Sequence, residues 1–296
     1  MFRIATLLDR RPSNYFKKWV EYHTQIFDKN KFIFVDFSKD IEELKQYLTN
    51  QGFEKVVVLT ITKNKVTDTS KFDEELNMLL EHMVEINAPI IFHCCYKNII
   101  EQTPYSDTYK SLISETPYIV NRIKSQWINK KKFKFIFLDS DELLVGKNIN
   151  ELLNSDFEYI VPEGYEIIQS AYENKMHWHI PIYIQRSYWK RNSFFYDKPI
   201  IVQKDIQWGP GRHLHLHKEN IIQPSEDIKL IHLRDVCFDY LYEENNYSKI
   251  LYPLGVEDHR KNWEDYDVFK GWAIERQLGI ESIPEDIKDL FKKYNV

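Results

Sequence analysis

The sequence predicts an α/β protein with a mostly parallel sheet flanked by helices, and three observations support this fold class. Short apolar segments alternate with amphipathic ones throughout residues 1–145. This alternation is typical of parallel sheets, because each connection between parallel strands needs a crossover helix. One apolar segment, 133–138, runs directly into the acidic sequence DSDE, which begins at Asp139. After Gly146 the rhythm changes to short aromatic segments separated by turns, which predicts a mixed second half.

The first half is expected to contain five strands separated by helices. Apolar runs bounded by polar residues predict the strands Arg3–Leu8, Lys31–Phe37, Lys55–Ile61, Pro89–Cys95 and Phe133–Leu138. The apolar stripe of Tyr15, Trp19, Tyr22 and Ile26 predicts a first helix, capped by Ser13 or Asn14. Further helices are expected after Ser38 and Asp40, at about Phe72–Ile86, and near Ile119–Ile128 after a polar loop.

The second half is expected to be strand-rich up to about Tyr240. Its predicted strands are Tyr159–Pro162, Tyr165–Ser170, His179–Gln185, Pro199–Gln203 and Lys229–Leu233. Beyond Tyr240 the pattern is polar and helical, and it ends with an amphipathic stretch, Pro284–Tyr294. Without repeats or a long flexible linker, the chain divides into a domain of residues 1–240, with halves 1–145 and 146–240, and a C-terminal helical extension, 241–296.

Composition narrows the classes of function. The chain has 296 residues, of which 43% are hydrophobic, and a net charge of -5. These values fit a folded protein and argue against a broad nucleic-acid surface. No apolar run approaches the roughly 18 residues that a membrane span needs, and the N-terminus lacks the apolar core of a signal peptide. We therefore expect a cytoplasmic protein with no transmembrane segment and no nucleic-acid partner.

The acidic sequence after the fifth predicted strand carries the main chemical signal. In open α/β sheets, the carboxyl ends of the strands line the ligand crevice. On an extended chain, Asp139 and Asp141 would point the same way. Two adjacent hard oxygen donors suit Mg²⁺ or Mn²⁺, and such an ion neutralises phosphates. The alternative is an acidic turn that only ends a buried strand.

The order of these features resembles the GT-A class of nucleotide-sugar-dependent glycosyltransferases, specifically its family 2-like group. A Rossmann-like parallel half that ends in DxDE is followed, in this class, by a mixed half that contacts the acceptor. Looser matches lie elsewhere in residues 1–240. They are Trp19, Tyr22, His23, Asp36, Ser38 and Asp40 near the start, Lys198, Pro199, Gly211 and His213 in the acceptor half, and His232 and Asp235 near its end.

The resemblance implies a transferase that moves a sugar from a nucleoside-diphosphate sugar to a hydroxyl of a glycan or other acceptor, with inversion of the anomeric centre. Its cofactor would be Mn²⁺ or Mg²⁺, held by Asp139, Asp141 and His232. The donor would contact Asp9, Arg10, Asp36, Asp139 and His213. Glu142 is expected to support the loop or a metal-bound water.

An inverting transfer also needs a base, because the acceptor hydroxyl must lose its proton. Four carboxylates are open candidates, and no motif singles one out. They are Glu163, Glu166, Asp205 and Asp235, of which Asp235 and Glu163 are the first to test.

Two other functions remain open. FLDSDELL also fits a HAD-type phosphatase, in which Asp139 would be the nucleophile and Asp141 the acid/base. Leu143 departs from the usual motif of that class, and the motif lies in the middle of the chain. The second alternative is a degenerate sugar-binding module without turnover.

Overall fold

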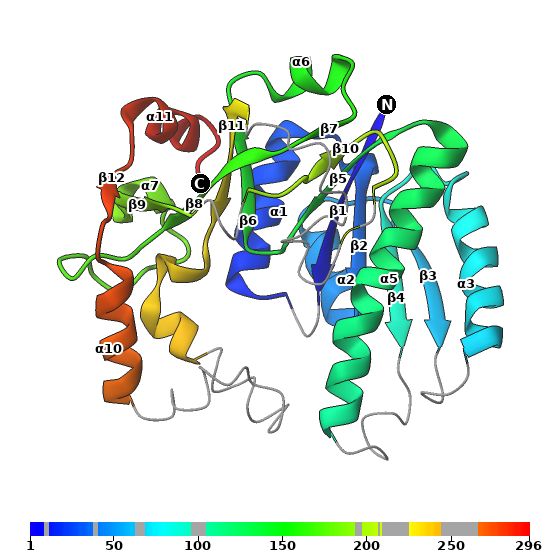
Figure 1. The fold of residues 1–296 in the computed structure, drawn as a ribbon, viewed down its shortest axis with the longest axis horizontal. Coiled ribbons are helices and arrows are strands. Elements are labelled where there is room, and N and C mark those ends of the chain that lie inside the picture. Colours follow the sequence, from blue (N-terminus) through cyan, green and yellow to red (C-terminus); the bar gives the residue numbers. More distant parts are fainter. Residues whose placement is uncertain are drawn as a thin grey trace.

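The computed structural model describes residues 1–8, 12–37, 41–62, 69–95, 105–192, 197–206, 208, 225–243 and 266–296. Within this part the chain forms an α/β structure with two sheets (Figure 1). The helices are α1 (Asn14–Ile26), α2 (Ile41–Asn50), α3 (Thr69–Met83), α5 (Tyr105–Lys131), α6 (Ile149–Asn154), α7 (Ile182–Gln185), α10 (Tyr266–Arg276) and α11 (Glu285–Lys293). Short 3-10 helices span Lys29–Lys31 and Arg234–Val236.

The first sheet, sheet A, has seven strands in the order β3-β4-β2-β1-β5-β10-β7 among the described residues. The strands are β1 (Phe2–Leu8), β2 (Phe32–Asp36), β3 (Val57–Thr62), β4 (Ile90–Cys95), β5 (Lys134–Leu138), β7 (Tyr159–Ile160) and β10 (Ile201–Val202). The first five strands of this order are parallel, and β10 runs antiparallel to both β5 and β7. Parallel strands buried on both faces explain the continuous apolar runs in the sequence.

The second sheet, sheet B, is mixed and has the order β12-β9-β8-β11-β6. Its strands are β6 (Glu142–Gly146), β8 (Pro162–Ile167), β9 (Tyr188–Arg191), β11 (Ser225–His232) and β12 (Glu281–Ser282). β11 lies between β6 and β8, antiparallel to the first and parallel to the second. The late strand β12 pairs with β9, so the C-terminal part of the chain joins this sheet.

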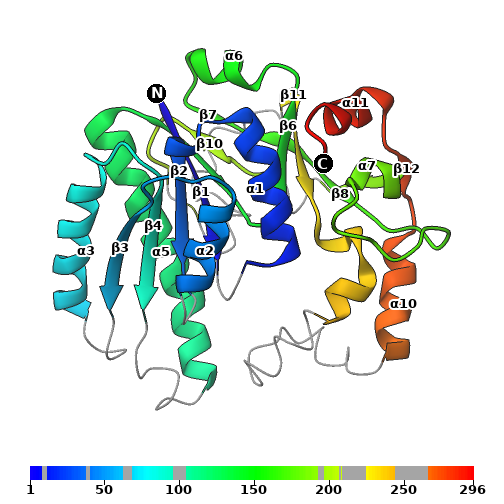
Figure 2. The ribbon, with the colours of Figure 1, turned by 180° about the vertical axis from the view of Figure 1, so that it is seen from behind.

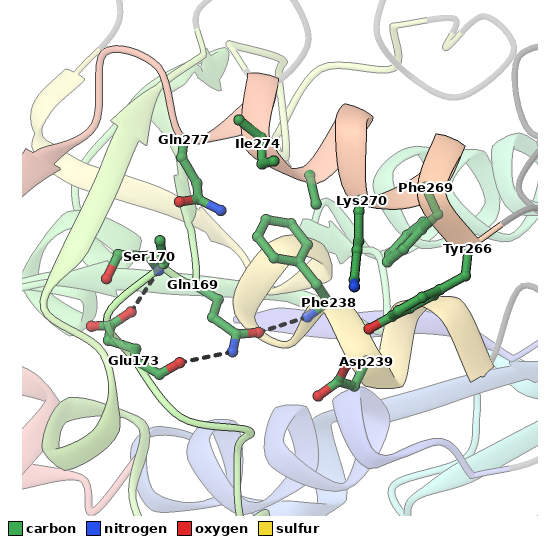
Figure 3. Close-up of a pocket in the computed structure, with 12 residues that line it drawn as sticks. Gln169, Ser170, Glu173, Phe238, Asp239, Tyr266, Phe269, Lys270, Ile274 and Gln277 are labelled. Atoms are coloured by element: carbon green, nitrogen blue, oxygen red, sulfur yellow. Dashed lines mark hydrogen bonds between the residues drawn. The ribbon is translucent and has the colours of Figure 1, made fainter.

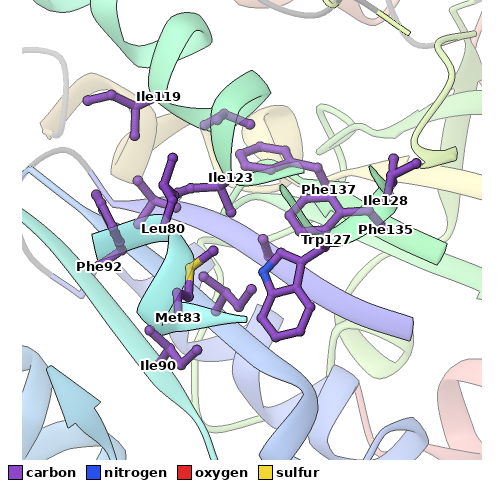
Figure 4. Packing of buried hydrophobic residues seen from close by; sticks show 14 of the residues in the cluster. Leu80, Met83, Ile90, Phe92, Ile119, Ile123, Trp127, Ile128, Phe135 and Phe137 are labelled. Atoms are coloured by element: carbon purple, nitrogen blue, oxygen red, sulfur yellow. The ribbon is translucent and has the colours of Figure 1, made fainter. Parts of the chain in front are cut away.

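Helices cover both faces of sheet A, as the two opposite views show: α3 and α5 lie on one face, and α1 and α2 on the other (Figures 1 and 2). Successive residues of β5 alternate between these faces. Phe135 and Phe137 pack with α3 and α5 in one core cluster, whereas Ile136 and Leu138 pack with α1 and α2 in another. Figure 4 shows the first cluster, where the buried Trp127 of α5 lies beside Phe135.

Helix α1 packs between the two sheets. Ser13 caps its N-terminus, because the Ser13 hydroxyl accepts a hydrogen bond from Phe16 N–H at 3.1 Å. One side of the helix, with Trp19, packs against sheet A, and another side, with Tyr22, packs against sheet B. This double burial explains why the apolar stripe of the helix is so aromatic.

Two side chains of α1 also hold strand β6, which is an edge strand of sheet B. Tyr22 Oη donates a hydrogen bond to Leu144 O at 3.0 Å, and Leu144 N–H donates one to His23 Nε2 at 3.3 Å. His23 Nδ1–H in turn donates to Trp19 O at 2.9 Å, which fixes the neutral tautomer of the ring. The outward backbone groups of Leu144, which an edge strand leaves unpaired, are therefore satisfied by α1.

Several sequence predictions are confirmed in the described residues. The five first-half strands, the first helix with its Ser13 cap, and the C-terminal amphipathic helix are all present. α11 packs on α7 and β6. The division into residues 1–240 and 241–296 stays a prediction. No described helix has both the length and the apolar run needed to cross a bilayer.

Other predictions were wrong. Residues 179–185 were expected to form a strand, but α7 (Ile182–Gln185) is a helical turn that follows Pro181. The polar loop expected before Ile119 contains the first part of α5, which begins at Tyr105. Strands β6, β9 and β12 were not predicted, since β6 directly follows the acidic residues and the other two are short and polar.

Candidate functional site

The acidic residues after β5 form a tight turn that joins the two sheets. β5 belongs to sheet A and β6 to sheet B, and only Asp139, Ser140 and Asp141 separate the two strands. Glu142 N–H donates a hydrogen bond to Asp139 O at 3.0 Å, which closes a β-turn. The extended conformation expected for these residues is therefore wrong: the chain reverses here. We call residues 139–142 the acidic turn.

A buried lysine holds one side of this turn. Lys198 Nζ lies 2.5 Å from Glu142 Oε1 and 3.1 Å from Asp139 Oδ2. Glu142 Oε2 also accepts a hydrogen bond from Asp139 N–H at 2.9 Å. The side chains of Lys198 and Glu142 are each 1% exposed, whereas that of Asp139 is 30% exposed. Lys198, Glu142 and Asp139 therefore form one group, in which Glu142 supports the turn and Asp139 remains partly exposed to solvent.

A buried histidine holds the other side. His232 Nε2, at the end of β11, lies 3.1 Å from Asp141 Oδ2, and its Nδ1 lies 3.6 Å from Glu166 Oε1. The strand register explains the second contact, because His232 is directly opposite Glu166 in the β8–β11 pair. Burial alone would lower the pKa of His232, but Asp141 and Glu166 together raise it to about 10. The ring is therefore a cation.

The same cation keeps its two neighbours ionised. Burial opposes ionisation of Asp141, but His232, with Lys198 and Arg234 farther away, lowers the pKa of this carboxyl to about 2. Burial likewise opposes ionisation of Glu166, and His232 and Arg276 lower its pKa to about 2. Both groups are therefore carboxylates at neutral pH.

An arginine from α10 completes this side of the site. Arg276 Nε donates to Asp235 Oδ2 at 2.7 Å, and Arg276 Nη2 donates to Glu166 Oε2. Asn192 Nδ2 donates to the same Glu166 oxygen at 3.1 Å. Asp235 is buried, and burial together with the nearby Glu166 raises its pKa. We call Asp141, Glu166, His232, Asp235 and Arg276 the His232 group.

One oxygen of Asp235 stands apart from this network. Asp235 Oδ1 is buried and accepts no hydrogen bond from any residue that the structure describes. Buried polar atoms in folded proteins are nearly always paired, so an unpaired one requires an explanation. A raised pKa and an unpaired oxygen both fit a carboxyl group that takes up a proton.

The structure brings together only some of the predicted site residues. Asp139, Asp141, His232 and Asp235 meet around the acidic turn, as described above. Glu163 lies three positions before Glu166 in β8 and pairs with Lys229 instead. Odd spacing in a strand places the two glutamates on opposite faces. Asp205 is also elsewhere, beside Lys124 of α5 at 3.0 Å.

Asp36 lies at the end of β2, along the same edge of sheet A as the acidic turn. Since β1 separates β2 from β5, Asp36 is two strand spacings, or roughly 10 Å, from the end of β5. Asp36 is buried, and its Oδ2 is 2.7 Å from His93 Nδ1 at the end of β4. The remaining predicted donor contacts, Asp9, Arg10 and His213, lie outside the described residues.

Four members of the site had no role assigned from sequence, or only an open one. Lys198 was noted only as part of a K-P-I motif, Glu166 was an open base candidate, and Asn192 and Arg276 were not predicted. Arg276 is 110 positions from Glu166. An ion pair over such a separation leaves no periodic pattern in the sequence, so Arg276 could not be predicted. Lys198 could have been singled out, because it belongs to the K-P-I motif with Pro199.

Asp139 and Asp141 are the candidate ligands for a divalent cation at the acidic turn. Among the described residues, no group of three or more His, Cys, Asp or Glu side chains is arranged to hold a metal. Mg²⁺ commonly binds through one or two carboxylates, with substrate phosphates and water as its other ligands. Asp139 and Asp141 provide two such carboxylates, 30% and 24% exposed. They are the partly exposed carboxylates of the turn that could hold such a cation, and each is paired with a cationic side chain, Lys198 or His232.

Comparisons with other proteins assign no family or function to this site. A scan of family models, curated proteins and solved structures found no match to the chain. The described structure itself establishes an α/β fold with two mixed sheets, the first of them parallel over five strands, and a charged site where the two sheets meet.

Proposed function

We propose that this protein is a metal-dependent glycosyltransferase of the GT-A type, which transfers a sugar from a nucleoside-diphosphate sugar to an acceptor hydroxyl with inversion. One observation carries the proposal: the acidic turn lies at the carboxyl end of β5, where the parallel part of sheet A passes directly into sheet B. Ligands of open α/β sheets bind at this edge. Asp36 at the end of β2 adds an acidic group on the same edge.

The proposed donor site uses the solvent-accessible carboxylates of the turn. Asp139 and Asp141 would hold Mn²⁺ or Mg²⁺, and Asp36 would accept hydrogen bonds from the ribose or base. When bound, the metal supplies positive charge to the leaving diphosphate. Asp9, Arg10 and His213 remain proposed contacts to the donor. The chain itself orients the turn, since Lys198 fixes Glu142 and Asp139 in place.

His232 has two predicted roles, and its charge favours one of them. A protonated imidazole has no lone pair for a metal, and the pKa of His232 is raised to about 10 by its carboxylate neighbours, against the effect of burial. We therefore propose that His232 acts as a cation that orients Asp141 and attracts the diphosphate, while its role as a metal ligand requires loss of that proton.

Asp235 is the base that the geometry supports best. Arg276 orients one of its oxygens, and the other accepts no hydrogen bond from the described residues. Its raised pKa makes it a better proton acceptor than Glu166, whose pKa is about 2. Glu163 is less well supported, because it faces away from this group and pairs with Lys229.

A thermal-shift screen of nucleotide sugars with Mn²⁺ tests the donor site. A ligand that binds only the folded protein raises its melting temperature, so UDP- or GDP-sugars should do so in the presence of Mn²⁺. Asp141→Ala should abolish this shift. Asp289→Ala, which removes an exposed carboxylate of α11, is the matched control and should leave the shift unchanged.

Turnover tests the base and the two alternative functions. Asp235→Asn should lower kcat by about 10²–10⁴-fold, and Glu163→Gln should have a much smaller effect. Hydrolysis of an aryl phosphate that is lost in Asp139→Asn, together with no nucleotide-sugar shift, would establish the phosphatase instead. Binding of nucleotide sugars without turnover on a broad acceptor panel would identify a sugar-binding module.

A further inference from the structure

One arginine beside the acidic turn has no partner in the protein. Arg234 begins the short 3-10 helix Arg234–Val236, two positions after His232. Among the residues that the structure describes, its guanidinium donates no hydrogen bond and forms no ion pair. The guanidinium groups of the other described arginines all donate hydrogen bonds; these are Arg3, Arg122, Arg186, Arg191 and Arg276. Arg234 is therefore the described arginine that remains available to a ligand.

The end of the Arg234 side chain reaches the solvent. The residue is half-buried, and its Nε is covered. Nη1 and Nη2 also lack a partner among the described residues, but they are not fully covered. These two groups carry most of the N–H donors of a guanidinium, in a planar fork that matches pairs of phosphate or carboxylate oxygens. A ligand can therefore reach the donors without any rearrangement of the protein.

The backbone that carries Arg234 is held on both sides. Leu233 N–H donates a hydrogen bond to Asp141 O at 2.8 Å, which ties this segment to the acidic turn. Tyr15 Oη of α1 donates to Arg234 O at 2.9 Å, and Val236 N–H donates to Leu233 O at 3.1 Å. The side chain thus starts from a fixed position beside the turn, which lowers the entropy cost of binding a ligand there.

The charge of Arg234 acts on two carboxyl groups of the proposed site. Burial opposes ionisation of Asp141, but nearby cations, with Arg234 among them, lower its pKa to about 2. Burial is the main cause that raises the pKa of Asp235, and Arg234 is one of two arginines that limit this rise. The guanidinium therefore lies near the proposed metal ligand and the proposed base without forming an ion pair with either.

The other cations around the acidic turn are already bound to carboxylates. They are Lys198, His232 and Arg276, which contact Asp139, Asp141, Glu142, Glu166 and Asp235. Five carboxylates against four cations, Arg234 included, leave this site at -1 when all are ionised. A polyanion alone would be repelled, but a divalent cation at the turn reverses the sign of this charge. The balance favours a phosphate ligand that binds together with a metal.

The pocket beside α10 contains the other cation that a phosphate could contact (Figure 3). This pocket has a volume of about 360 Å³, and Lys270 is the cation in its lining. Lys270 is exposed, and its Nζ lies 4.6 Å from the centre of the Tyr266 ring. A lysine offers no planar fork for paired oxygens, so Arg234 is the better contact, and Lys270 supplies a control.

We propose that Arg234 binds the diphosphate of the donor, with its Nη groups donating to paired phosphate oxygens. Hydrogen bonds between a guanidinium and phosphate oxygens are among the strong ones, because both partners are charged. The same contact would stabilise the negative charge that develops on the leaving diphosphate. The identity of this ligand rests on the proposed transferase function, but its binding can be measured without turnover.

Calorimetric titration of the full chain with inorganic pyrophosphate, in the presence of Mn²⁺, tests the proposal. Arg234→Met should weaken pyrophosphate binding by about 10- to 100-fold, since it removes charged hydrogen bonds. Arg234→Lys keeps the charge but not the fork, so it should lose less. Two matched controls should bind pyrophosphate as the wild type does: Lys270→Met removes the pocket cation, and Arg122→Met removes another half-buried arginine, on α5.

Binding of Mn²⁺ alone separates this role from a structural one. A variant that only disturbs the acidic turn would weaken the binding of both Mn²⁺ and pyrophosphate. Loss of a nearby cation should instead leave Mn²⁺ binding unchanged or make it tighter, because like charges repel. The proposal is overturned if pyrophosphate does not bind, if Arg234→Met binds it as the wild type does, if this variant loses Mn²⁺ affinity in parallel, or if Lys270→Met causes the loss.

The nucleotide-sugar thermal shift, measured on the same preparations, reports separately on the proposed transferase. Pyrophosphate binding that depends on Arg234, without any nucleotide-sugar shift, would support the anion site and argue against the transferase. A nucleotide-sugar shift that Arg234→Met leaves unchanged would support the transferase and overturn the role proposed for Arg234.

Discussion

Two buried histidines lie on either side of strand β6 and have opposite charge states. His23 contacts β6 from helix α1, and burial lowers its pKa to about 3. His232 lies on the neighbouring strand β11, and its pKa is raised to about 10. The two ring nitrogens of His23 form hydrogen bonds with backbone groups, those of Trp19 and Leu144. His232 instead lies between two carboxylates, which outweigh the cost of burying its charge.

This difference separates a neutral supporting region from a charged one. On the α1 side, neutral hydrogen bonds fix the backbone of β6 just beyond the acidic turn. On the other side, buried charges compensate one another and leave Asp139 and Asp141 partly exposed. A buried charge is tolerated only where a partner stabilises it, so the charged side should be far more sensitive to the loss of a single group than the neutral side.

The largest effect is expected from Lys198→Met, which leaves Glu142 buried without its cation. Removing one partner of a buried ion pair costs about 3–5 kcal/mol, and the two side chains are each 1% exposed. Urea unfolding at pH 7 measures this loss. The double variant with Glu142→Gln should recover part of it, because the uncompensated charge is then absent.

An exposed lysine provides the control for that variant. Lys204 pairs with Glu158, and these side chains are 61% and 56% exposed. Lys204→Met should change the free energy of unfolding by less than about 1 kcal/mol. Equal effects of the two lysine substitutions would contradict the view that burial makes the charged side sensitive.

The next effect is expected from Arg276→Met, which removes the cation shared by Glu166 and Asp235. Two buried carboxyl groups would then repel each other, at a cost of about 3 kcal/mol. Burial and Glu166 already raise the pKa of Asp235, and the substitution raises it further. A raised folded-state pKa stabilises the protein below that pKa and loses this effect as the pH rises.

The measurement for Arg276→Met is therefore urea unfolding at pH 5 and at pH 8. The loss of stability relative to wild type should be greater at pH 8, where Asp235 is ionised in the variant. Arg122, whose hydrogen bond to Tyr118 is exposed, gives the control Arg122→Met, which should show a small loss at both values. A penalty independent of pH would indicate that packing, rather than charge, was lost.

Much of the neutral, apolar framework could be predicted from the sequence. β1, β2, β4 and β5 are buried on both faces, so each appears as a continuous apolar run, and α1 shows helical spacing. β6 was missed because its run, LLVG, follows the acidic residues and reads as part of the same motif. α7 was predicted as a strand because four residues of mixed polarity carry too little periodicity to distinguish the two states.

The charged site was less predictable, because its members come from distant parts of the chain. Asp139 and Asp141 stand out because they directly follow an apolar strand. Lys198, the partner of Asp139, lies 59 positions later in the chain. His232, the partner of Asp141, lies on sheet B. The turn at residues 139–142 depends on these contacts as well as on local sequence. Only a folded structure shows which distant cation faces which carboxylate.

An acid-dependent effect of roughly 2 kcal/mol is expected on the neutral side. With a folded pKa of about 3, His23 stays neutral in the folded protein, whereas the unfolded chain binds a proton below about pH 6.5. Its contribution to stability is therefore complete above pH 6.5 and is lost as the pH falls toward 3. Between pH 7 and pH 5, wild type should lose roughly 2 kcal/mol more than His23→Gln.

Urea unfolding of both proteins across this pH range measures that difference. Glutamine can donate to Trp19 O and accept from Leu144 N–H without titrating, so the variant should be less sensitive to acid. His177→Gln, at an exposed position, should retain the full wild-type dependence on pH. If His23→Gln retains it too, His23 is not the neutral buried group described here.

The smallest effect is expected from Tyr22→Phe, which removes only the hydrogen bond to Leu144 O. The aromatic ring and its contact with Tyr294, at 5.4 Å between centroids, can remain. An unpaired buried carbonyl costs about 1 kcal/mol, which urea unfolding resolves against the exposed control Tyr172→Phe. Because no charge is uncovered, this loss should be the same at pH 5 and pH 8, unlike that of Arg276→Met. A loss as large as that of Lys198→Met would mean that β6 depends on α1 as strongly as on its buried charges, and the division into a neutral supporting side and a charged side would fail.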